Sequence, residues 1–101
     1  MREGRQRLDK WLWFARFAKT RSAAARLVED GFVRVNGLRA EAAAKGVGLG
    51  DVLTIAAPHR TAVVRVLDLG DRRGPYEEAR RLYADEAERD AGALVTGPGE
   101  A

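Results

Sequence analysis

The chain has 101 residues, no cysteine and a formal net charge of +3 at pH 7. Its length fits one domain with a modest core, and its hydrophobic content of 46% is ordinary for a globular protein. The absence of cysteine excludes a disulfide framework and a thiolate zinc site. No apolar run approaches the ~20 residues of a membrane-spanning helix, and no secretory signal pattern occurs. We therefore expect a cytoplasmic protein without a membrane partner.

The positive charge is concentrated near the N-terminus. Residues 1–26 carry eight Lys or Arg side chains against two acidic ones, a balance of +6, whereas residues 71–101 carry five against eight, a balance of −3. A local basic field of this kind is typical of proteins that bind polyanions. Taken alone, it fits a solvated protein surface equally well, so the functional argument depends on the motifs.

Two helices are predicted after a frayed start at residues 1–6. The first begins near Leu8, and its apolar positions repeat at i, i+3, i+4 and i+7, as on one buried helix face. These positions are Leu8, Trp11, Leu12 and Ala15. The second helix begins at Thr20 or Ser22, whose hydroxyls can cap free backbone N–H groups, and it ends before Gly31. The short connection between them predicts a helical hairpin.

The apolar period then changes to that of strands. Asn36 and Gly37 both tolerate a positive φ, so the segments that flank them predict a β-hairpin with a two-residue turn. Residues 52–55 and 62–67 are rich in β-branched side chains and predict two further strands. Residues 46–51 contain three glycines and predict a turn region.

The C-terminal part is predicted to add one helix and a tail. Residues 76–91 place apolar side chains on one helical face, and we expect residues 71–91 to pack on a preceding domain of residues 7–70. Residues 92–101 are rich in glycine and are expected to be disordered. The predicted fold is therefore α+β: a helical hairpin followed by a small, mostly antiparallel sheet, with a C-terminal helix.

Basic side chains gather where the second helix begins. The start of a helix presents free N–H groups and the positive end of its dipole, which suits a phosphate group. The hydroxyls of Thr20 and Ser22 can reach phosphate oxygens, and an arginine can grip two of them at once. The cations around this end are Arg16, Lys19, Arg21 and Arg26. The sequence thus predicts an anion site of phosphate size here.

A longer motif surrounds this site. It consists of Arg7-Leu8-Asp9, then Leu12, then Thr20-Arg21-Ser22 before an alanine-rich helix, then Gly31-Phe32-Val33-Arg34-Val35-Asn36-Gly37. The motif resembles the RNA-binding domain named after small-subunit ribosomal protein S4, also called the alpha-L motif. The resemblance covers residues 7–55, and it implies that RNA lies across the helix pair and the adjoining hairpin.

The resemblance and the basic residues together predict one RNA-binding surface. Its members are Arg7, Lys10, Arg16, Lys19, Thr20, Arg21, Ser22, Arg26, Arg34, Asn36 and Arg39. Trp11 and Phe17 are expected in the core, and Asp9 is expected to have a structural role, such as ordering a basic neighbour. Trp13 could stack on an RNA base or pack against the C-terminal helix.

The first helix also resembles a narrower family. The residues concerned are Arg7-Leu8-Asp9-Lys10-Trp11-Leu12-Trp13, then Ala15-Arg16-Phe17 and Lys19-Thr20-Arg21. They are similar to those of ribosome-associated heat-shock proteins of about fifteen kilodaltons. This resemblance implies binding to ribosomal RNA on free large ribosomal subunits that carry a stalled peptidyl-tRNA, and a role in recycling them. Arg16 stands where generic S4 domains have glycine, and an acidic C-terminal end stands where the better-known heat-shock proteins have a basic extension.

We expect a monomeric binding protein, not an enzyme, without catalytic residues, cofactor or metal. His59 is the only histidine and has no acid or nucleophile near it in sequence, and no metal-ligand spacing occurs. Two alternatives remain open. One is a module that targets RNA for a separate RNA-modifying enzyme, and the other is a protein-interaction module that uses the C-terminal helix.

Overall fold

The structure is a computed structural model that describes residues 4–58 and 60–86. Its elements follow in the order β1 (Arg5–Arg7), α1 (Leu8–Phe14), α2 (Arg21–Glu29), β2 (Val33–Val35), β3 (Leu38–Arg39), β4 (Gly46–Gly48), β5 (Val52–Ala57), β6 (Arg60–Val66), α3 (Tyr76–Ala79), the 3-10 helix η1 (Arg80–Leu82) and β7 (Tyr83–Asp85). The predicted α+β class, with a helical hairpin before an antiparallel sheet, is confirmed. In the described part of the chain, no helix is long and apolar enough to cross a membrane.

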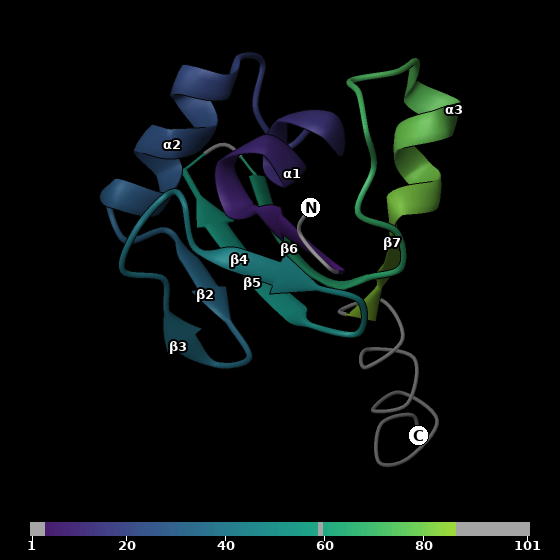
Figure 1. Cartoon of the computed structure of the whole chain (residues 1–101). Helices are drawn as coiled ribbons and strands as arrows, with labels where there is room; N and C mark the ends of the chain where they lie inside the picture. The colour runs from purple at the N-terminus through teal and green to yellow at the C-terminus, as the bar shows by residue number, and fades with distance from the viewer. Residues whose placement is uncertain (1–3, 59, 87–101) are drawn as a thin grey trace, which may run out of the picture.

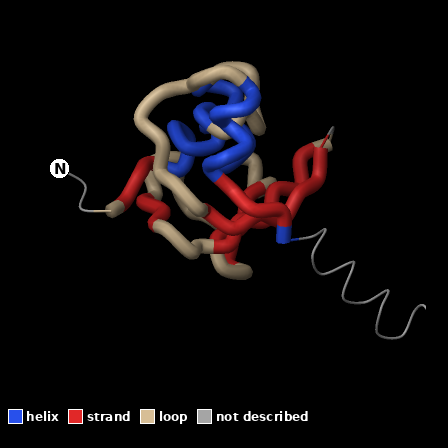
Figure 2. The backbone as a smooth tube through the Cα atoms, turned by 90° about the vertical axis from the view of Figure 1, so that its right-hand side faces the viewer, coloured by secondary structure: helices blue, strands red, loops and turns tan. Residues whose placement is uncertain are grey.

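The helices cover one face of a five-stranded sheet (Figure 1). The strand order is β3-β2-β5-β6-β7, and each neighbouring pair is antiparallel. The strands β1 and β4 form a separate antiparallel pair. Seen from the side, the helices form one layer and the strands another (Figure 2). The core lies between these layers.

Trp11 of α1 lies at the centre of the core. Its side chain is fully buried, and its Nε1 donates a hydrogen bond to the carbonyl oxygen of Asp68 at 2.8 Å. Its ring stacks on Phe17 with 6.1 Å between centroids and meets the edge of Tyr83 at 6.3 Å. Alternate side chains of β5 and β6 point into the same core: Leu53, Ile55, Val64 and Val66. The predicted core positions of Trp11 and Phe17 are confirmed.

Both helices of the hairpin end in the same backbone motif, which needs one residue in the left-handed region. At the end of α2 that residue is Gly31, with φ of 87°. At the end of α1 it is Arg16, with φ of 66°. There the N–H of Arg16 binds the carbonyl oxygen of Trp13 at 3.1 Å. The next N–H, of Phe17, donates to the carbonyl oxygen of Leu12 at 2.9 Å. Arg16 therefore occupies a backbone position that favours glycine.

The predicted hairpin turn at Asn36 and Gly37 is confirmed, with φ of 53° and 86°. The side chain of Asn36 also ties this turn to the start of β5. Its Nδ2 donates to Oδ1 of Asp51 at 3.2 Å, and its Oδ1 accepts from the N–H of Val52 at 2.9 Å. Asn36 thus has a structural role that the turn prediction alone did not include.

The prediction that residues 1–6 are frayed is wrong for the part that the structure describes. Strand β1 pairs with β4, and Gln6 is buried with a relative exposure of only 3%. The turn prediction for residues 46–51 is confirmed only at Leu49 and Gly50, because Gly46–Gly48 form β4. A Cβ on Gly46 would lie 3.2 Å from the Arg5 side chain, and a Cβ on Gly48 would lie 3.2 Å from the Gly4 carbonyl oxygen. Two backbones thus approach closely at Gly48, whereas Gly46 lies against the Arg5 side chain. Residues 1–3 lie outside the described residues.

The predicted C-terminal helix is confirmed only over its first turn, and the rest of its described part differs. The α-helix covers only Tyr76–Ala79, the turn of η1 follows, and β7 pairs with β6. This pairing satisfies the edge of β6 and buries Tyr83, whose ring lies 5.0 Å from that of Phe17. Tertiary pairing thus prevails over the helical pattern. The protein-interaction alternative loses the long helix on which it rested, while residues 87–101 lie outside the described residues.

The left-handed backbone of Arg16 yields a stability prediction. Both Arg16→Ala and Arg16→Gly remove the side chain and its contacts, so the difference between the two variants isolates the backbone conformation. We expect the Gly variant to have the higher free energy of unfolding, by about 1 kcal/mol, because only a residue with a Cβ is strained at φ of 66°. Urea denaturation of both variants measures this difference, and equal stability would contradict the left-handed assignment.

Candidate nucleic-acid interface

The N-terminus of α2 is formed as the sequence predicts. Thr20 is the N-cap, and its Oγ1 accepts a hydrogen bond from the N–H of Ala23 at 3.0 Å. Among the described residues, no acceptor lies on the N–H groups of Arg21 and Ser22, which point out of the helix end. Lys19, Thr20, Arg21 and Ser22 are all exposed. The helix end therefore offers two free N–H donors beside two cations.

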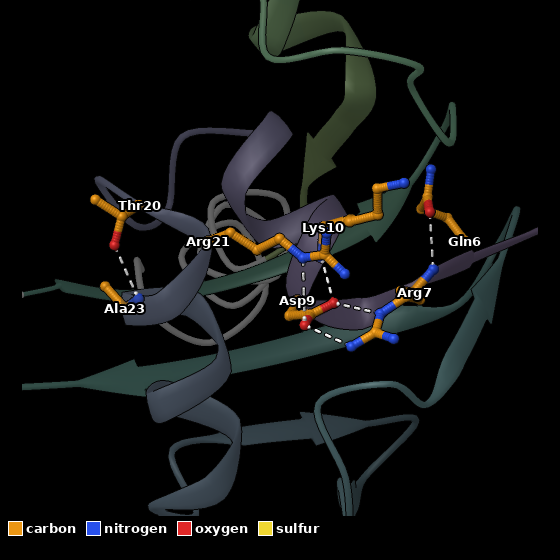
Figure 3. A network of polar contacts seen from close by, with 7 residues as sticks. All are labelled: Gln6, Arg7, Asp9, Lys10, Thr20, Arg21 and Ala23. Atoms are coloured by element: carbon orange, nitrogen blue, oxygen red, sulfur yellow. Dashed lines mark hydrogen bonds and ion pairs between the residues drawn. The ribbon is translucent and has the colours of Figure 1, made fainter.

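Asp9 connects this helix end to the preceding elements (Figure 3). Arg7 grips its carboxylate with a two-pronged contact, from Nε to Oδ1 at 3.0 Å and from Nη2 to Oδ2 at 2.9 Å. Nε of Arg21 lies 3.6 Å from Oδ2, and the N–H of Lys10 donates to Oδ1 at 2.7 Å. The carboxylate thus joins β1, α1 and α2. The predicted ordering role of Asp9 toward Arg7 is confirmed.

The same geometry explains the ionisation of Asp9. Its side chain is only 4% exposed, and burial alone would raise its pKa. The hydrogen bonds and charge of Arg7, the Lys10 N–H and the charge of Arg21 outweigh burial, so the pKa of Asp9 lies below its ordinary value. Both arginines stay half exposed, at 45% and 43% of their side chains. They are held in place yet remain accessible to a ligand.

The hairpin of β2 and β3 extends the basic surface. Arg34 and Arg39 are paired across the two strands and both are exposed. Nη2 of Arg39 lies 3.4 Å from the carbonyl oxygen of Glu29, which links the hairpin to the end of α2. Arg26 is exposed on α2 itself. These basic side chains therefore lie on α2 and on the hairpin that follows it in the chain.

Arg16 has a different set of partners from the rest of the predicted surface. Its Nε donates to the carbonyl oxygen of Gly74, in the connection between β6 and α3, at 3.0 Å. Its carbonyl oxygen accepts from Nη1 of Arg60 at 3.4 Å. Arg73 donates to the carbonyl oxygens of Trp13 and Ala18, at 3.1 and 3.4 Å. Sequence reasoning missed Arg60 and Arg73, because contacts across more than 40 residues leave no local signal.

Two further predicted residues have limited roles in this geometry. Lys10 is half buried, and its N–H serves Asp9. Trp13 is half buried beside Phe14, with 5.7 Å between their rings, and its stacking on RNA stays a prediction. Within residues 4–58 and 60–86, no group of three or more His, Cys, Asp or Glu side chains could hold a metal ion.

Comparison with known proteins agrees with this arrangement. The profile of the S4 domain family matches residues 6–53. Heat shock protein 15 of Escherichia coli K12 is 43% identical over 82 residues, which are 81% of this chain and 61% of the relative. The RQC P-site tRNA stabilizing factor of Bacillus subtilis is 35% identical over 76% of this chain and 87% of its own. The chain thus spans about three fifths of the first relative's length.

A solved structure is similar over nearly the whole chain. It is described as a trimeric structure of Vibrio cholerae heat shock protein 15, and it covers 92% of this chain and 97% of its own at 37% identity, with a TM-score of 0.76. This likeness includes the segment beyond residue 53, where the S4 profile ends. The edge strand β7 and the loop of residues 71–75 that precedes it in the chain thus lie in the part beyond the S4 profile.

The buried carboxylate yields a pH prediction. Asp9→Asn should lower the free energy of unfolding at pH 7 by about 1–3 kcal/mol, because the variant loses charge-assisted hydrogen bonds from Arg7. Since the folded-state pKa of Asp9 is lowered, this stabilisation is complete above the ordinary value of 3.8 and is lost as pH falls through the lowered folded pKa. Urea denaturation across pH 2–7 should show the two proteins converging in acid. A constant difference at all pH values would contradict the charge-based role.

Proposed function

Because the chain belongs to the heat shock protein 15 branch of the S4 domain family, we propose that it binds structured ribosomal RNA. The observation that carries the proposal is the exposed helix end of α2, where Thr20 caps the helix and the N–H groups of Arg21 and Ser22 are free. Free N–H groups and adjacent cations are what an RNA phosphate requires. The contact surface continues over Arg26 to the β2–β3 hairpin.

The proposed residues have distinct roles in this contact. Arg7 and Arg21 are positioned by Asp9 and present the rest of their guanidinium groups outward. Lys19 and Arg26 have no ion pair among the described residues, so their charge is fully available to phosphate. Asn36 shapes the hairpin and supports the surface through its bonds to Asp51 and to the N–H of Val52. Phosphate contacts of this kind position an RNA and supply most of the affinity.

The partner within the ribosome is the finer part of the proposal. We place the contact on the free large subunit that carries a stalled peptidyl-tRNA, in a heat-shock or recycling role. The name of the Bacillus subtilis relative, a P-site tRNA stabilizing factor, supports this choice. The proposed role is binding without catalysis, cofactor or metal. A monomer suffices for it, because the whole surface comes from one chain.

Neutralising two free cations tests the surface. The variant Lys19→Gln/Arg26→Gln should bind a ribosomal RNA fragment more weakly than the native protein at low salt. The slope of log K against log salt should become shallower by roughly 1.4–1.8, because each phosphate contact contributes about 0.7–0.9. Fluorescence anisotropy over a salt series measures both quantities.

A matched control removes two arginine charges elsewhere. Arg5→Gln/Arg65→Gln changes the net charge equally, at an edge strand and at the far end of β6. We expect it to keep most of the native slope. If the two double variants bind RNA alike, binding depends on net charge alone, and the proposed surface is wrong.

A further inference from the structure

We propose that the chain has a second RNA-contacting face, which grips an unpaired strand next to the structured RNA. We call it the arginine cluster: Arg16, Arg60, Arg73 and Arg80. It surrounds the connection between α1 and α2 and includes residues from beyond the S4 match. The inference rests on the proposed RNA binding and adds a second surface and a second kind of RNA to it.

Contacts from three separate segments bring the cluster together. Arg60, at the start of β6, places its guanidinium 4.3 Å over the ring of Phe17 and donates to the Arg16 carbonyl oxygen. Arg80, in η1, lies 5.7 Å from the ring of Tyr83, which itself packs against Phe17. The rings of Phe17 and Tyr83, which contact each other, thus link the guanidinium groups of Arg60 and Arg80.

The loop before α3 supplies the third member. Arg73 is fixed by the carbonyl oxygens of Trp13 and Ala18, on the two sides of the same connection. Arg16 is fixed in turn by the carbonyl oxygen of Gly74, next to Arg73. Each of the two segments, the loop of residues 71–75 and the connection between α1 and α2, therefore contributes an arginine that donates to backbone carbonyl oxygens of the other.

The partners of these arginines are uncharged, which distinguishes them from other arginines of the chain. Arg7, Arg65 and Arg72 each form an ion pair with a carboxylate at 3.0 Å or less. Among the described residues, no ion pair within 4.0 Å involves a member of the arginine cluster, and Asp85 acts on Arg80 only at longer range. Carbonyl oxygens and ring faces order the cluster without cancelling its charge.

An exposed aromatic ring favours RNA over an acidic peptide as the partner. Tyr76 is 60% exposed, and its hydroxyl accepts a hydrogen bond from Nη1 of Arg80 at 3.2 Å. The guanidinium of Arg80 also lies 5.9 Å from the Tyr76 ring. An exposed ring beside an arginine that has no ion pair among the described residues matches proteins that stack an unpaired base while holding its phosphate. A peptide carboxylate would use the charge but not the ring.

Two RNA probes separate this face from the α2 surface. One is a labelled hairpin of ribosomal RNA, and the other is the same hairpin with a single-stranded oligouridylate extension. We expect the native protein to bind the extended probe more tightly and with a steeper salt dependence. Arg60→Gln/Arg80→Gln should bind both probes alike, and its salt slope on the extended probe should be shallower by about 1.4. Tyr76→Leu should lose roughly fivefold or more in affinity for the extended probe only.

Control variants keep the outcomes distinct. Arg5→Gln/Arg65→Gln should retain the preference for the extended probe. Arg60→Lys/Arg80→Lys keeps the charges and should retain most of the slope of log K against log salt. Together with thermal melts of all variants, this result excludes misfolding as the cause of a loss in the Gln variant. Lys19→Gln/Arg26→Gln should lower the affinity for both probes. Unchanged affinity would count against the proposed function alone.

Three results would overturn the second face. The extension could give the native protein no added affinity. The Arg60/Arg80 variant could keep the native preference for it. An oligoglutamate peptide could displace the extension and bind equally well to Tyr76→Leu, which would assign the cluster to an acidic protein partner.

Discussion

The carboxylate of Asp9 is the contact on which the basic surface depends. It is buried at the start of α1, and it holds Arg7 of β1 and Arg21 of α2 on opposite sides. Without its negative charge, the two guanidinium groups at this junction would repel one another. With it, the junction closes, β1 stays paired with β4, and the free end of α2 is held beside Lys19. A structural carboxylate therefore positions a cationic surface.

The small net charge of +3 conceals that the basic side chains differ in how far a nearby carboxylate compensates their charge. Arg65 and Arg72 are neutralised by glutamates, and Arg7 is largely neutralised by Asp9. Lys19 and Arg26 keep their charges at the α2 surface. Arg60 also keeps its charge, because its contacts are the uncharged carbonyl oxygen of Arg16 and the ring of Phe17. Local compensation, rather than total charge, determines where a polyanion can be held.

Local signals were sufficient for half of this architecture. Thr20 and the Asn36-Gly37 turn act within a few residues of themselves, so the helix start and the hairpin could be predicted. The pairing of β1 with β4 and of β6 with β7 depends on partners about 20 to 40 residues away, for which no local pattern exists. The site divides likewise: the cations of α2 were predictable, whereas the bond from Arg16 to Gly74 was not.

We propose that exposed cations beside the free end of α2 attach this chain to ribosomal RNA. Sedimentation of cell lysate through a density gradient tests it most directly. At low salt the protein should migrate with free large ribosomal subunits, and at high salt it should be released, because phosphate contacts weaken steeply with ionic strength. Migration at the top of the gradient at low salt, or association that persists unchanged at high salt, would contradict the account.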